Sequence, residues 1–460
     1  MRSVPLLATL TLTVCSPLPN ESTTAQSSST GAPSSWATSE STTSESTTGE
    51  PTPTTGGTDT STSTGQATTI ATDESTTGPV MGEDEALLRR AIAGEVDPDE
   101  ALRTIAGRGG LPVETLDGDY LFACLCGPGD WALTGDHNGW VDSPMQTTGP
   151  LWWLAAEVPA PEGSLYKFHE PDPDPQQDLW IADPLGRRHG YDNNGRHSLV
   201  RASAAHFERW YGLEGAGLQP RDLEVLVPDD GAFTHALYVH DGQNLFDPEG
   251  INGGWKLQES APPGLLVVGI ANTGVARLDE YTHVTDIYDG VNEGGGQAAA
   301  YAELVDTIIR PRMEAAYGAA EVVGTMGSSL GGLVSLVIAD LYPDRYAMAL
   351  SLSGTMGWGS IGLQNQTIIE RYAAAGKRDF AIYIDSGGAG PCGDLDMDGT
   401  DDDTDDFDNY CENAQLRDVL TDLGYSEGVD LWYVYAENAK HSELDWAARV
   451  GVPMAAFMTL

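Results

Sequence analysis

The sequence predicts an α/β fold for the second half of the chain, an all-β sandwich before it and a disordered spacer at the N-terminus. From Ala205 onward, near-continuous apolar segments alternate with segments of helical spacing, which is typical of a mostly parallel sheet covered on both faces. Between Pro112 and Leu199, short strand-like segments alternate with turn signals, as in a β-sandwich. Residues 16–80 hold almost no periodic apolar pattern, so they cannot contribute to a core.

The charge of the chain excludes one class of partner. Its 460 residues include 69 acidic and 23 basic side chains, which give a formal net charge of -46. A surface this acidic repels nucleic acids and anionic membranes. We therefore expect no nucleic-acid partner, and membrane association only through an attached lipid.

The N-terminus predicts export. Residues 1–15 carry one arginine, an apolar run from Val4 to Val14 and then Cys15, which has the length and order of a secretory signal. The end of this run resembles a bacterial lipobox, although Val14 replaces the small residue expected before the cysteine. This resemblance implies lipidation of Cys15, with plain secretion as the alternative. Residues 16–80 are dominated by Ser, Thr, Gly and Pro and are predicted to form a disordered tether.

Two short segments of helical spacing within residues 81–110 predict a small helical lead-in, broken between Gly94 and Pro98. The predicted β-sandwich follows at residues 111–204. Its strand candidates are LFACLC, WALTGD, LWWLAAEVP, LYKFHE and HSLVRA, and turn-forming sequences such as GPGD and PDPDP separate them.

This β region resembles the immunoglobulin-like early-set, glycogen-binding-type module of branching enzymes, isoamylases and enterochelin esterases. The motifs that carry the likeness are GDHNGW at residues 135–140, YKF at 166–168 and WIADP at 180–184. Such modules sometimes stack sugar rings on tryptophan faces, and the candidates here are Trp140, Trp152, Trp153 and Trp180. Packing in the core of the sandwich is the competing interpretation of these tryptophans.

The α/β region spans residues 205–460. Its strand candidates are LEVLVP, HALYVHDG, LLVVGIA, VVGTMG, AMALSLSG, FAIYID and VDLWYVYA. The helical candidates between them include QAAAYAELVDTIIRPRMEAAYG, LVSLVIADLYPDRY and CENAQLRDVLTDLG. This alternation predicts parallel strands joined by crossover helices.

Ser329 is the candidate nucleophile. Gly327, Ser329 and Gly331 form a GxSxG pattern with a predicted strand before it and a predicted helix directly after it, the context of a nucleophile elbow. A Cβ at either flanking glycine is expected to clash in such a strained turn, and the helix N-terminus points its amides at the reacting centre. The alternative is a small-residue turn that serves only close packing of helix and sheet.

His441 is the candidate base. It is the one histidine of nine that follows Ser329 in the chain, and in α/β-hydrolases the order is Ser, then an acid, then His. It lies directly after the predicted strand VDLWYVYA and before the last helical segment, where that order requires it.

Residues 205–460 resemble the putative esterase family, which includes siderophore esterases, feruloyl and acetyl xylan esterases and mycolyltransferases. The motifs that carry the resemblance are LYVHDGQNLFD at residues 237–247, RLDEYT at 277–282, GSSLGG at 327–332 and KHSELDW at 440–446. It implies an α/β-hydrolase fold, Ser329 as nucleophile, His441 as base and no cofactor for catalysis.

The catalytic acid departs from the family pattern. Relatives usually place it five residues after an aspartate at the strand end, and here that position is Gly390. We predict Asp394, four residues on, as the acid that orients the imidazole. Asp385 lies closer to the sheet, where it can also fix the loop by local hydrogen bonds.

The same loop has the ligand spacing of a calcium site. The pattern DxDxDGTxDxxD predicts a structural Ca²⁺ held by Asp394, Asp396, Asp398, Thr400, Asp402 and Asp405. A solvated acidic insertion is the alternative. Cys392 and Cys411 bracket the loop and are predicted to form a disulfide, whereas Cys124 and Cys126 either pair with each other or stay reduced. A zinc site is not expected, because no Cys or His cluster has suitable spacing.

The predicted oxyanion hole combines two backbone amides. One is that of Leu330, directly after the nucleophile, and the other that of Gln243 in the loop after the strand LYVH. Trp255, Arg277, Glu280 and Tyr281 recur in the family-like motifs and either line the pocket or pack the framework.

The sequence therefore predicts an exported, tethered serine hydrolase that cleaves carboxylic esters through an acyl-enzyme on Ser329. Siderophore trilactones, acylated or feruloylated polysaccharides and acyl-transfer substrates are the competing substrate classes. The alternative function is a calcium-stabilised surface binding protein with an inactive hydrolase fold, which the Gly390 departure favours and the retained Ser329 and His441 oppose.

Overall fold

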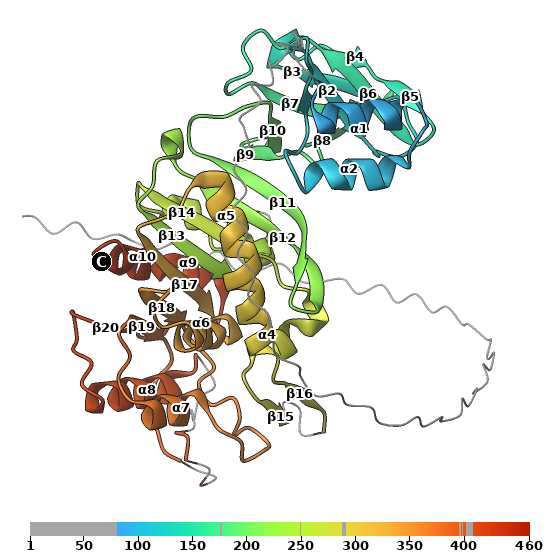
Figure 1. Ribbon diagram of the computed structural model, residues 1–460. Helices are drawn as coiled ribbons and strands as arrows, with labels where there is room; N and C mark the ends of the chain where they lie inside the picture. Colours follow the sequence, from blue (N-terminus) through green and yellow to red (C-terminus); the bar gives the residue numbers. More distant parts are fainter. Residues whose placement is uncertain are drawn as a thin grey trace, which may run out of the picture. The chain divides into compact units, whose positions relative to one another are not determined.

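The computed structural model describes residues 81–174, 177–248, 250–287, 291–394, 397, 399–401 and 408–460 (Figure 1). The predicted signal segment, Cys15 and the tether lie outside the described residues. Within the described part of the chain, no helix is both long and apolar enough to span a bilayer.

The predicted helical lead-in is confirmed as the pair α1 (Glu83–Ile92) and α2 (Pro98–Ala106). Asp97 starts α2 as its N-cap, because its carboxylate accepts a hydrogen bond from the backbone N–H of Glu100 at 3.0 Å, and Pro98 fits the first turn. Leu88 and Leu102 bury their side chains against Leu121 of the first β-sheet. This burial keeps a pair of helices in place that are too short to be stable alone.

Two β-sheets follow and share one core. The first has the order β1-β2-β6-β5, and the second contains β3, β4, β7, β8, β9 and β10. Phe122 from the first sheet packs with Leu133 and Phe168 from the second. The five predicted strand candidates form β2 (Tyr120–Cys124), β3 (Ala132–Gly135), β6 (Leu151–Ala156), β7 (Leu165–Glu170) and β10 (Gly195–Leu199). The structure adds β1 (Val113–Glu114), β4 (Ser143–Pro144), β5 (Gln146–Thr148), β8 (Leu179–Ile181) and β9 (Arg188–Asp192), which were not among those candidates.

The second of these sheets continues into the α/β region. Strand β11 (His206–Gly215) forms a long antiparallel hairpin with β12 (Leu218–Val227) and also pairs with β9, where Phe207 lies opposite His189. The result is a sheet of 14 strands among the described residues, ordered β20-β19-β18-β17-β13-β14-β12-β11-β9-β10-β7-β3-β4, with β8 attached to β7. Hydrogen bonding thus crosses the predicted boundary between residues 204 and 205.

In the α/β region, the sheet is parallel from β14 to β20, as predicted. Strand β14 pairs antiparallel with β12, and from β14 to β20 all neighbouring strands run parallel. Their residues are apolar on both faces because helices cover both sides. These strands are β13 (His235–His240), β14 (Leu265–Ile270), β17 (Val322–Ser328), β18 (Met348–Leu352), β19 (Ala381–Ser386) and β20 (Leu431–Tyr435).

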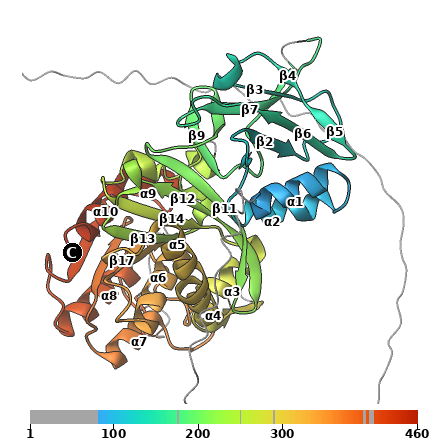
Figure 2. The same cartoon turned by 45° about the horizontal axis from the view of Figure 1, so that its top comes forward.

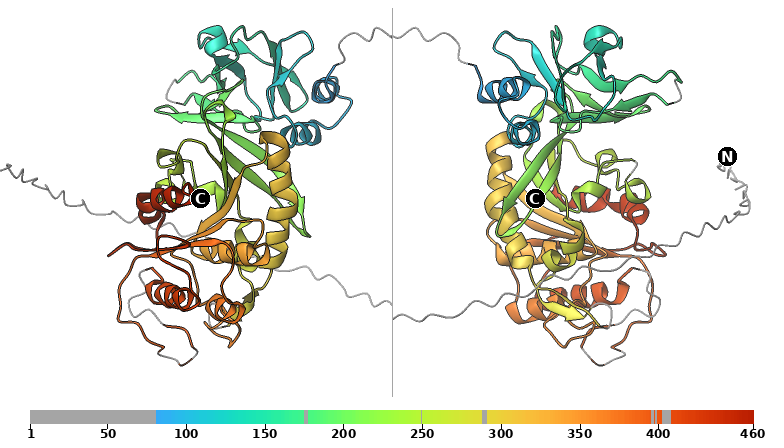
Figure 3. Two further views of the ribbon diagram at one scale, coloured as in Figure 1. Left: turned by 60° about the vertical axis from the view of Figure 1, so that its left-hand side comes forward. Right: turned by 90° about the vertical axis from the view of Figure 1, so that its right-hand side faces the viewer.

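Alternate residues of β13 enter two different cores. Tyr238 packs with the helices on one face, and Leu237 and Val239 pack with α9 and α10 on the other. Figures 1 and 2 show α9 and α10 (red) across the sheet from α5 and α6, and Figure 3 shows the same arrangement from two sides. The helices are α3 (Arg277–Tyr281), α4 (Ala298–Glu303), α5 (Arg310–Tyr317), α6 (Leu330–Leu341), α7 (Ile368–Ala375), α8 (Tyr410–Asp422), α9 (Glu443–Arg449) and α10 (Gly451–Phe457), with a π-helical segment at Leu304–Ile309 between α4 and α5.

Shorter elements fill the connections. A two-stranded sheet pairs β15 (Thr285–Ile287) with β16 (Glu293–Gly295). Single turns of 3-10 helix occur at Asp136–Asn138, Asp229–Gly231, Gly242–Asn244, Ile251–Gly253, Leu257–Glu259 and Gly274–Ala276. The overall architecture of residues 205–460 is that of an α/β-hydrolase, as the sequence predicted.

Candidate active site

Ser329 occupies a sharp turn between β17 and α6. Its backbone has φ 56° and ψ -127°, an unfavourable conformation for a residue with a side chain, and such strain is typical of functional turns. A Cβ at Gly327 would lie 2.6 Å from backbone atoms of Gly331, so only glycine fits there. At Gly331 the nearest atoms would be 3.4 Å away, an ordinary contact, and the expected clash at that glycine is therefore wrong.

The second crowded glycine of the turn is Gly332. A Cβ at this position would approach Ser351 Oγ to 2.3 Å, because α6 packs closely against β18. The turn is also fixed by the end of β18, since the N–H of Ser329 donates to the carbonyl of Leu352 at 3.0 Å. The strand, the strained serine and the helix together match the predicted nucleophile elbow.

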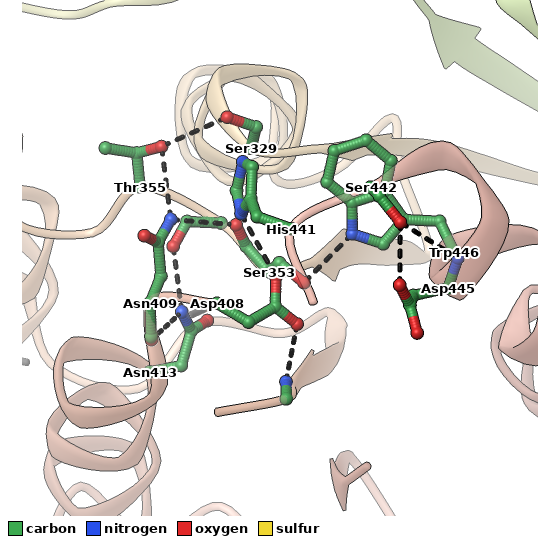
Figure 4. A network of polar contacts seen from close by, with 12 residues as sticks. Ser329, Ser353, Thr355, Asp408, Asn409, Asn413, His441, Ser442, Asp445 and Trp446 are labelled. Carbon is green, nitrogen blue, oxygen red and sulfur yellow. Dashed lines mark hydrogen bonds and ion pairs between the residues drawn. The ribbon is translucent and has the colours of Figure 1, made fainter. Parts of the chain in front are cut away.

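His441 contacts Asp408 and not Asp394. The imidazole Nδ1 lies 3.0 Å from Asp408 Oδ1, and the Asp408 side chain is fully buried. In the view of Figure 4 the His441 ring lies between Ser329 and Asp408. The second oxygen of Asp408 accepts a hydrogen bond from the Gly387 N–H at 2.6 Å.

The prediction that Asp394 partners His441 is therefore wrong. Asp394 Oδ2 instead accepts a hydrogen bond from the N–H of Gly399 at 3.1 Å, within its own loop. Asp408 lies 18 residues after Gly390 in the sequence and two residues before the first residue of α8. The one sequence signal for Asp408 is its place at the end of the acidic run, next to the N-terminus of a predicted helix.

A small polar network surrounds Ser329 (Figure 4). Ser329 Oγ lies 3.5 Å from Thr355 Oγ1, and Asn409 Nδ2 donates to the same threonine oxygen at 3.4 Å and to the carbonyl of Ser353 at 3.0 Å. Asn413 Nδ2 donates to the Gly354 carbonyl at 2.8 Å. The loop after β18 is thus tied to the start of α8, and sequence reasoning missed this connection.

The two predicted oxyanion residues lie at the same edge of the sheet. Leu330 is the first residue of α6, and Gln243 lies in the 3-10 turn after β13, the strand that pairs in parallel with β17. A Cβ at Gly242 would come within 2.5 Å of the Gly269 backbone, so the turn requires glycine there. Gln243 Oε1 accepts a hydrogen bond from the Asn272 N–H at 3.1 Å.

Asp241 anchors this turn in a left-handed conformation with φ 62°. Its carboxylate accepts hydrogen bonds from Arg277 Nε at 2.8 Å, Arg277 NH2 at 2.7 Å and Asn272 Nδ2 at 2.7 Å, while its N–H donates to the Tyr281 hydroxyl. Glu280 forms a buried bidentate ion pair with Arg221 at 3.0 Å. Of the two interpretations of these motif residues, the framework one fits their contacts.

Trp255 also belongs to the framework, because it is buried and its ring centroid lies 5.9 Å from that of Trp446. Trp446 in turn contacts the edge of the His441 ring at 4.9 Å between centroids. The base is thus held by packing as well as by its carboxylate partner.

The disulfide between Cys392 and Cys411 is present as predicted, and Cys124 and Cys126 are also joined. Of the six predicted calcium ligands, Asp396, Asp398, Asp402 and Asp405 lie outside the described residues. Thr400 is buried and its hydroxyl lies 3.0 Å from Ser360 Oγ. Among the described residues no group of three or more His, Cys, Asp or Glu side chains could hold a metal ion. The calcium loop therefore stays a prediction.

Comparison with solved structures gives matches of low identity. Ferric enterobactin esterase from Salmonella typhimurium is 14% identical, with 78% of this chain and 98% of that chain covered and a TM-score of 0.41. MPT51 of Mycobacterium tuberculosis is 14% identical, with 56% and 99% covered and a TM-score of 0.40. The siderophore hydrolase EstA of Aspergillus nidulans is 16% identical, with 55% and 95% covered and a TM-score of 0.39.

Sequence comparison gives two further matches. The uncharacterized protein YbbA of Bacillus subtilis (strain 168) is 30% identical over 132 residues, which are 28% of this chain and 52% of that protein. The chain thus matches about half the length of this curated relative. The family model described as "Putative esterase" matches residues 219–453, more than half of the chain. The chain therefore belongs to the putative esterase family, whose members are hydrolases that act on esters.

Proposed function

We propose that the protein is an exported serine hydrolase that cleaves carboxylic esters through an acyl-enzyme on Ser329. The observation that carries this proposal is the 3.0 Å contact between His441 and a fully buried Asp408, beside a serine held at φ 56° between strand and helix. A carboxylate that accepts the Nδ1 proton leaves Nε2 of the imidazole free to accept a proton from a serine hydroxyl.

In the proposed acylation step, Ser329 Oγ attacks the ester carbonyl carbon while His441 Nε2 takes the hydroxyl proton. The backbone N–H groups of Leu330 and Gln243 hold the oxyanion that forms, and donors of this kind contribute about 100-fold or more to turnover. Collapse of the tetrahedral intermediate breaks the bond to the alcohol, which leaves with the proton from His441. Water then repeats the sequence on the acyl-serine and releases the acid.

The test is hydrolysis of a short series of p-nitrophenyl esters by residues 81–460. Ser329→Ala is expected to abolish turnover, and labelling by a fluorophosphonate probe is expected in the wild type and absent in the variant. Thr307→Ala, at a remote exposed hydroxyl on the helix before α5, is the matched control. A folded wild type that neither turns over esters nor takes the label would favour the alternative, an inactive binding protein on this fold.

A second candidate function is saccharide binding by the β-sandwich, and it favours polysaccharide-linked esters as substrates. A cavity of about 480 Å³ is lined by Trp140, Lys167, Trp180, Asp192, Asn194 and His197. The two indole rings are 39% and 43% exposed, which is unusual for tryptophan in a small sandwich. Trp152 and Trp153 lie on the other sheet, in β6, and do not line this cavity.

Both exposed indoles are held in fixed orientations. Trp180 stacks on His169 with ring centroids 3.9 Å apart, and Trp140 Nε1 donates to Asp136 Oδ1 at 2.8 Å. Fixed aromatic faces beside hydrogen-bonding side chains suit the apolar faces and hydroxyl groups of sugar rings. Affinity electrophoresis in gels that contain soluble polysaccharides tests this function. Trp140→Ala and Trp180→Ala are expected to abolish retardation, whereas Leu179→Ala, next to Trp180 and also exposed, is expected to leave it unchanged.

Export, lipidation of Cys15 and a structural Ca²⁺ in the acidic loop complete the proposal. The sequence pattern at residues 394–405 supports the calcium part, because nine aspartates between 394 and 408 repel one another without a cation. Addition of Ca²⁺ after chelation is then expected to raise the melting temperature. Mass spectrometry of the N-terminus of the mature protein distinguishes a diacylated Cys15 from plain cleavage.

A further inference from the structure

We propose that Arg449 is a positioning residue of this site, which holds Asp408 in the orientation that faces His441. The inference rests on the proposed function, since it concerns the triad acid. Asp408 uses its two oxygens differently: Oδ1 meets the imidazole at 3.0 Å, and Oδ2 accepts from Arg449 NH2 at 3.0 Å as well as from the Gly387 N–H. Rotation of the carboxylate away from His441 would break both contacts on Oδ2.

The Arg449 guanidinium is itself fixed by several partners. Its Nε donates to Asp385 Oδ1 at 3.0 Å, and NH2 donates at 2.5 Å to Ser353 Oγ in addition to Asp408. The residue is only 7% exposed, so these contacts are shielded from water and strong. The rigid, planar guanidinium therefore sets the distance between the carboxylates of Asp385 and Asp408. A lysine ammonium lacks this fixed geometry and would position them less well.

Charge gives Arg449 a second role. Asp385 and Asp408 are both buried, and Arg449 is the cation that contacts both of them. Burial raises the pKa of Asp385 to about 6, with the Asp408 charge adding to this effect and Arg449 opposing it. Without Arg449, two buried carboxylates would face each other uncompensated, and one of them would take up a proton. A protonated Asp408 can no longer stabilise an imidazolium at His441.

Residues 441–449 contain both the proposed base, His441, and the positioning residue, Arg449. His441 lies just before Ser442, the N-cap of α9, whose Oγ accepts from the Asp445 N–H. Trp446 on the same helix contacts the His441 ring and donates through Nε1 to Ser353 Oγ at 3.0 Å, the atom that Arg449 also contacts. Figure 4 draws the contact between Trp446 and Ser353 as a dashed line. Helix α9 therefore couples the orientation of the base to that of its acid.

The test compares Arg449→Met, which removes the charge at similar volume, with Arg449→Lys, which keeps it but loses the planar guanidinium. Arg371→Met is the matched control, because it breaks a guanidinium pair with the buried Asp340 between α7 and α6. We expect Arg449→Met to lower kcat about 10- to 100-fold with little change in KM, and Arg449→Lys to recover part of the loss. The control is expected to keep the wild-type kcat.

The decisive readout is the downfield NMR signal of the His441 Nδ1 proton, which reports its hydrogen bond to Asp408 and requires no turnover. The charged groups that face Asp408 are His441 and Arg449 from the α9 region and Asp385 from β19. In Arg449→Met the carboxylate is no longer held toward the imidazole, so this proton signal is expected to move upfield or to be lost to exchange with water. In Arg449→Lys the signal is expected to lie closer to the wild-type position, and in Arg371→Met it is expected to be unchanged.

A His441 Nδ1 proton signal in Arg449→Met that coincides with the wild-type signal would overturn the inference, whatever happens to stability. If Arg449→Met fails to fold, the kcat of Arg449→Lys decides the question instead. A kcat equal to that of the wild type would show that the planar guanidinium has no positioning role. Failure of the proposed function looks different, because the wild type would then lack esterase activity while the Nδ1 proton signals of the wild type and Arg449→Met still differ.

Discussion

Asp408 is the residue at which local pattern and tertiary structure diverge most. Nine aspartates lie between residues 394 and 408, and in the sequence only its place at the end of this run, next to a predicted helix, separates Asp408 from the others. In the structure Asp408 is distinguished by burial against His441, Arg449 and the Gly387 N–H. Those partners come from β19, its loop and α9, so the assignment required the fold. Ser329 and His441 were predictable because a local strand-turn-helix motif and the chain order identify them.

Replacing Asp408 by Asn should disable the site. The amide would favour the wrong imidazole tautomer and could not stabilise its protonated form, so kcat should fall by about 1,000- to 10,000-fold. Steady-state kinetics on a p-nitrophenyl ester provides the measurement. Asp394→Asn serves as the comparison and should retain wild-type turnover, whereas equal losses in the two variants would contradict the assignment of Asp408.

At the scale of elements, the loop after β19 and the start of α8 act together. Cys411 lies in the first turn of α8, and its disulfide to Cys392 closes the acidic loop three residues beyond Asp408. Glu412 of the same turn accepts from the N–H groups of Met356 at 2.9 Å and Gly357 at 2.6 Å, in the loop after β18. The N-terminus of α8 thus joins the loop that carries the acid to the loop beside the nucleophile.

The double variant Cys392→Ala/Cys411→Ala should therefore lose activity as well as stability. Opening a loop of this length removes a constraint that typically stabilises a protein by about 2–4 kcal/mol. The Asp408 carboxylate should also be held less precisely beside His441. We therefore expect kcat to fall about tenfold or more, since small displacements of catalytic groups are costly. Thermal melting and kinetics at a temperature where the variant is folded separate the two effects. A variant that melts early but keeps full kcat would show that the disulfide serves stability alone.

Many elements were predictable from local sequence patterns, and the exceptions depend on contacts between distant segments. Period-two and period-3.6 apolar patterns are local, so the strand and helix candidates of both halves are present in the structure. The long strand β11 and its neighbour β9 were not among the candidates. The π-helical turn at Leu304–Ile309 and the pairing of β9 with β11 were not predicted. Both depend on contacts between distant segments, which periodicity does not encode.

At the scale of the whole molecule, buried histidines link stability to pH. His240 is fully buried between the hydroxyls of Tyr301 and Thr325, at 2.8 Å and 3.0 Å, and burial lowers its pKa to about 3. His189 is 1% exposed, and burial lowers its pKa to about 4. Below the ordinary histidine pKa of about 6.5, the unfolded chain binds protons that the native state refuses. Each such histidine therefore contributes stability that is present above pH 6.5 and lost as the pH falls toward its native value.

The variant His240→Gln should make this linkage visible. At neutral pH it should be less stable than the wild type by about 1–3 kcal/mol, because two buried hydrogen bonds are disturbed. The difference should shrink as the pH falls from 7 to 4.5, since a wild-type histidine loses at most about 1.4 kcal/mol per pH unit and glutamine does not titrate. Urea unfolding at pH 7, 6 and 4.5 measures the gap, and a constant gap would exclude His240 as a source of acid sensitivity. Comparison of variants is needed because Asp183 and Asp385, with pKa values raised to about 6, act in the opposite direction between pH 3.8 and 6.

The continuous sheet has a consequence for the strand edge at which the α/β region begins. In a chain that began at residue 205, the first residues of β11 would form an open strand edge. In the full chain, β9 pairs with Phe207 and Glu208, and the Arg209 N–H donates to the Arg187 carbonyl at 2.8 Å. Open edges recruit strands from other chains, which leads to aggregation. The β-sandwich therefore also protects the first residues of β11 from pairing with other chains. An α/β region expressed without the β-sandwich would expose this strand edge.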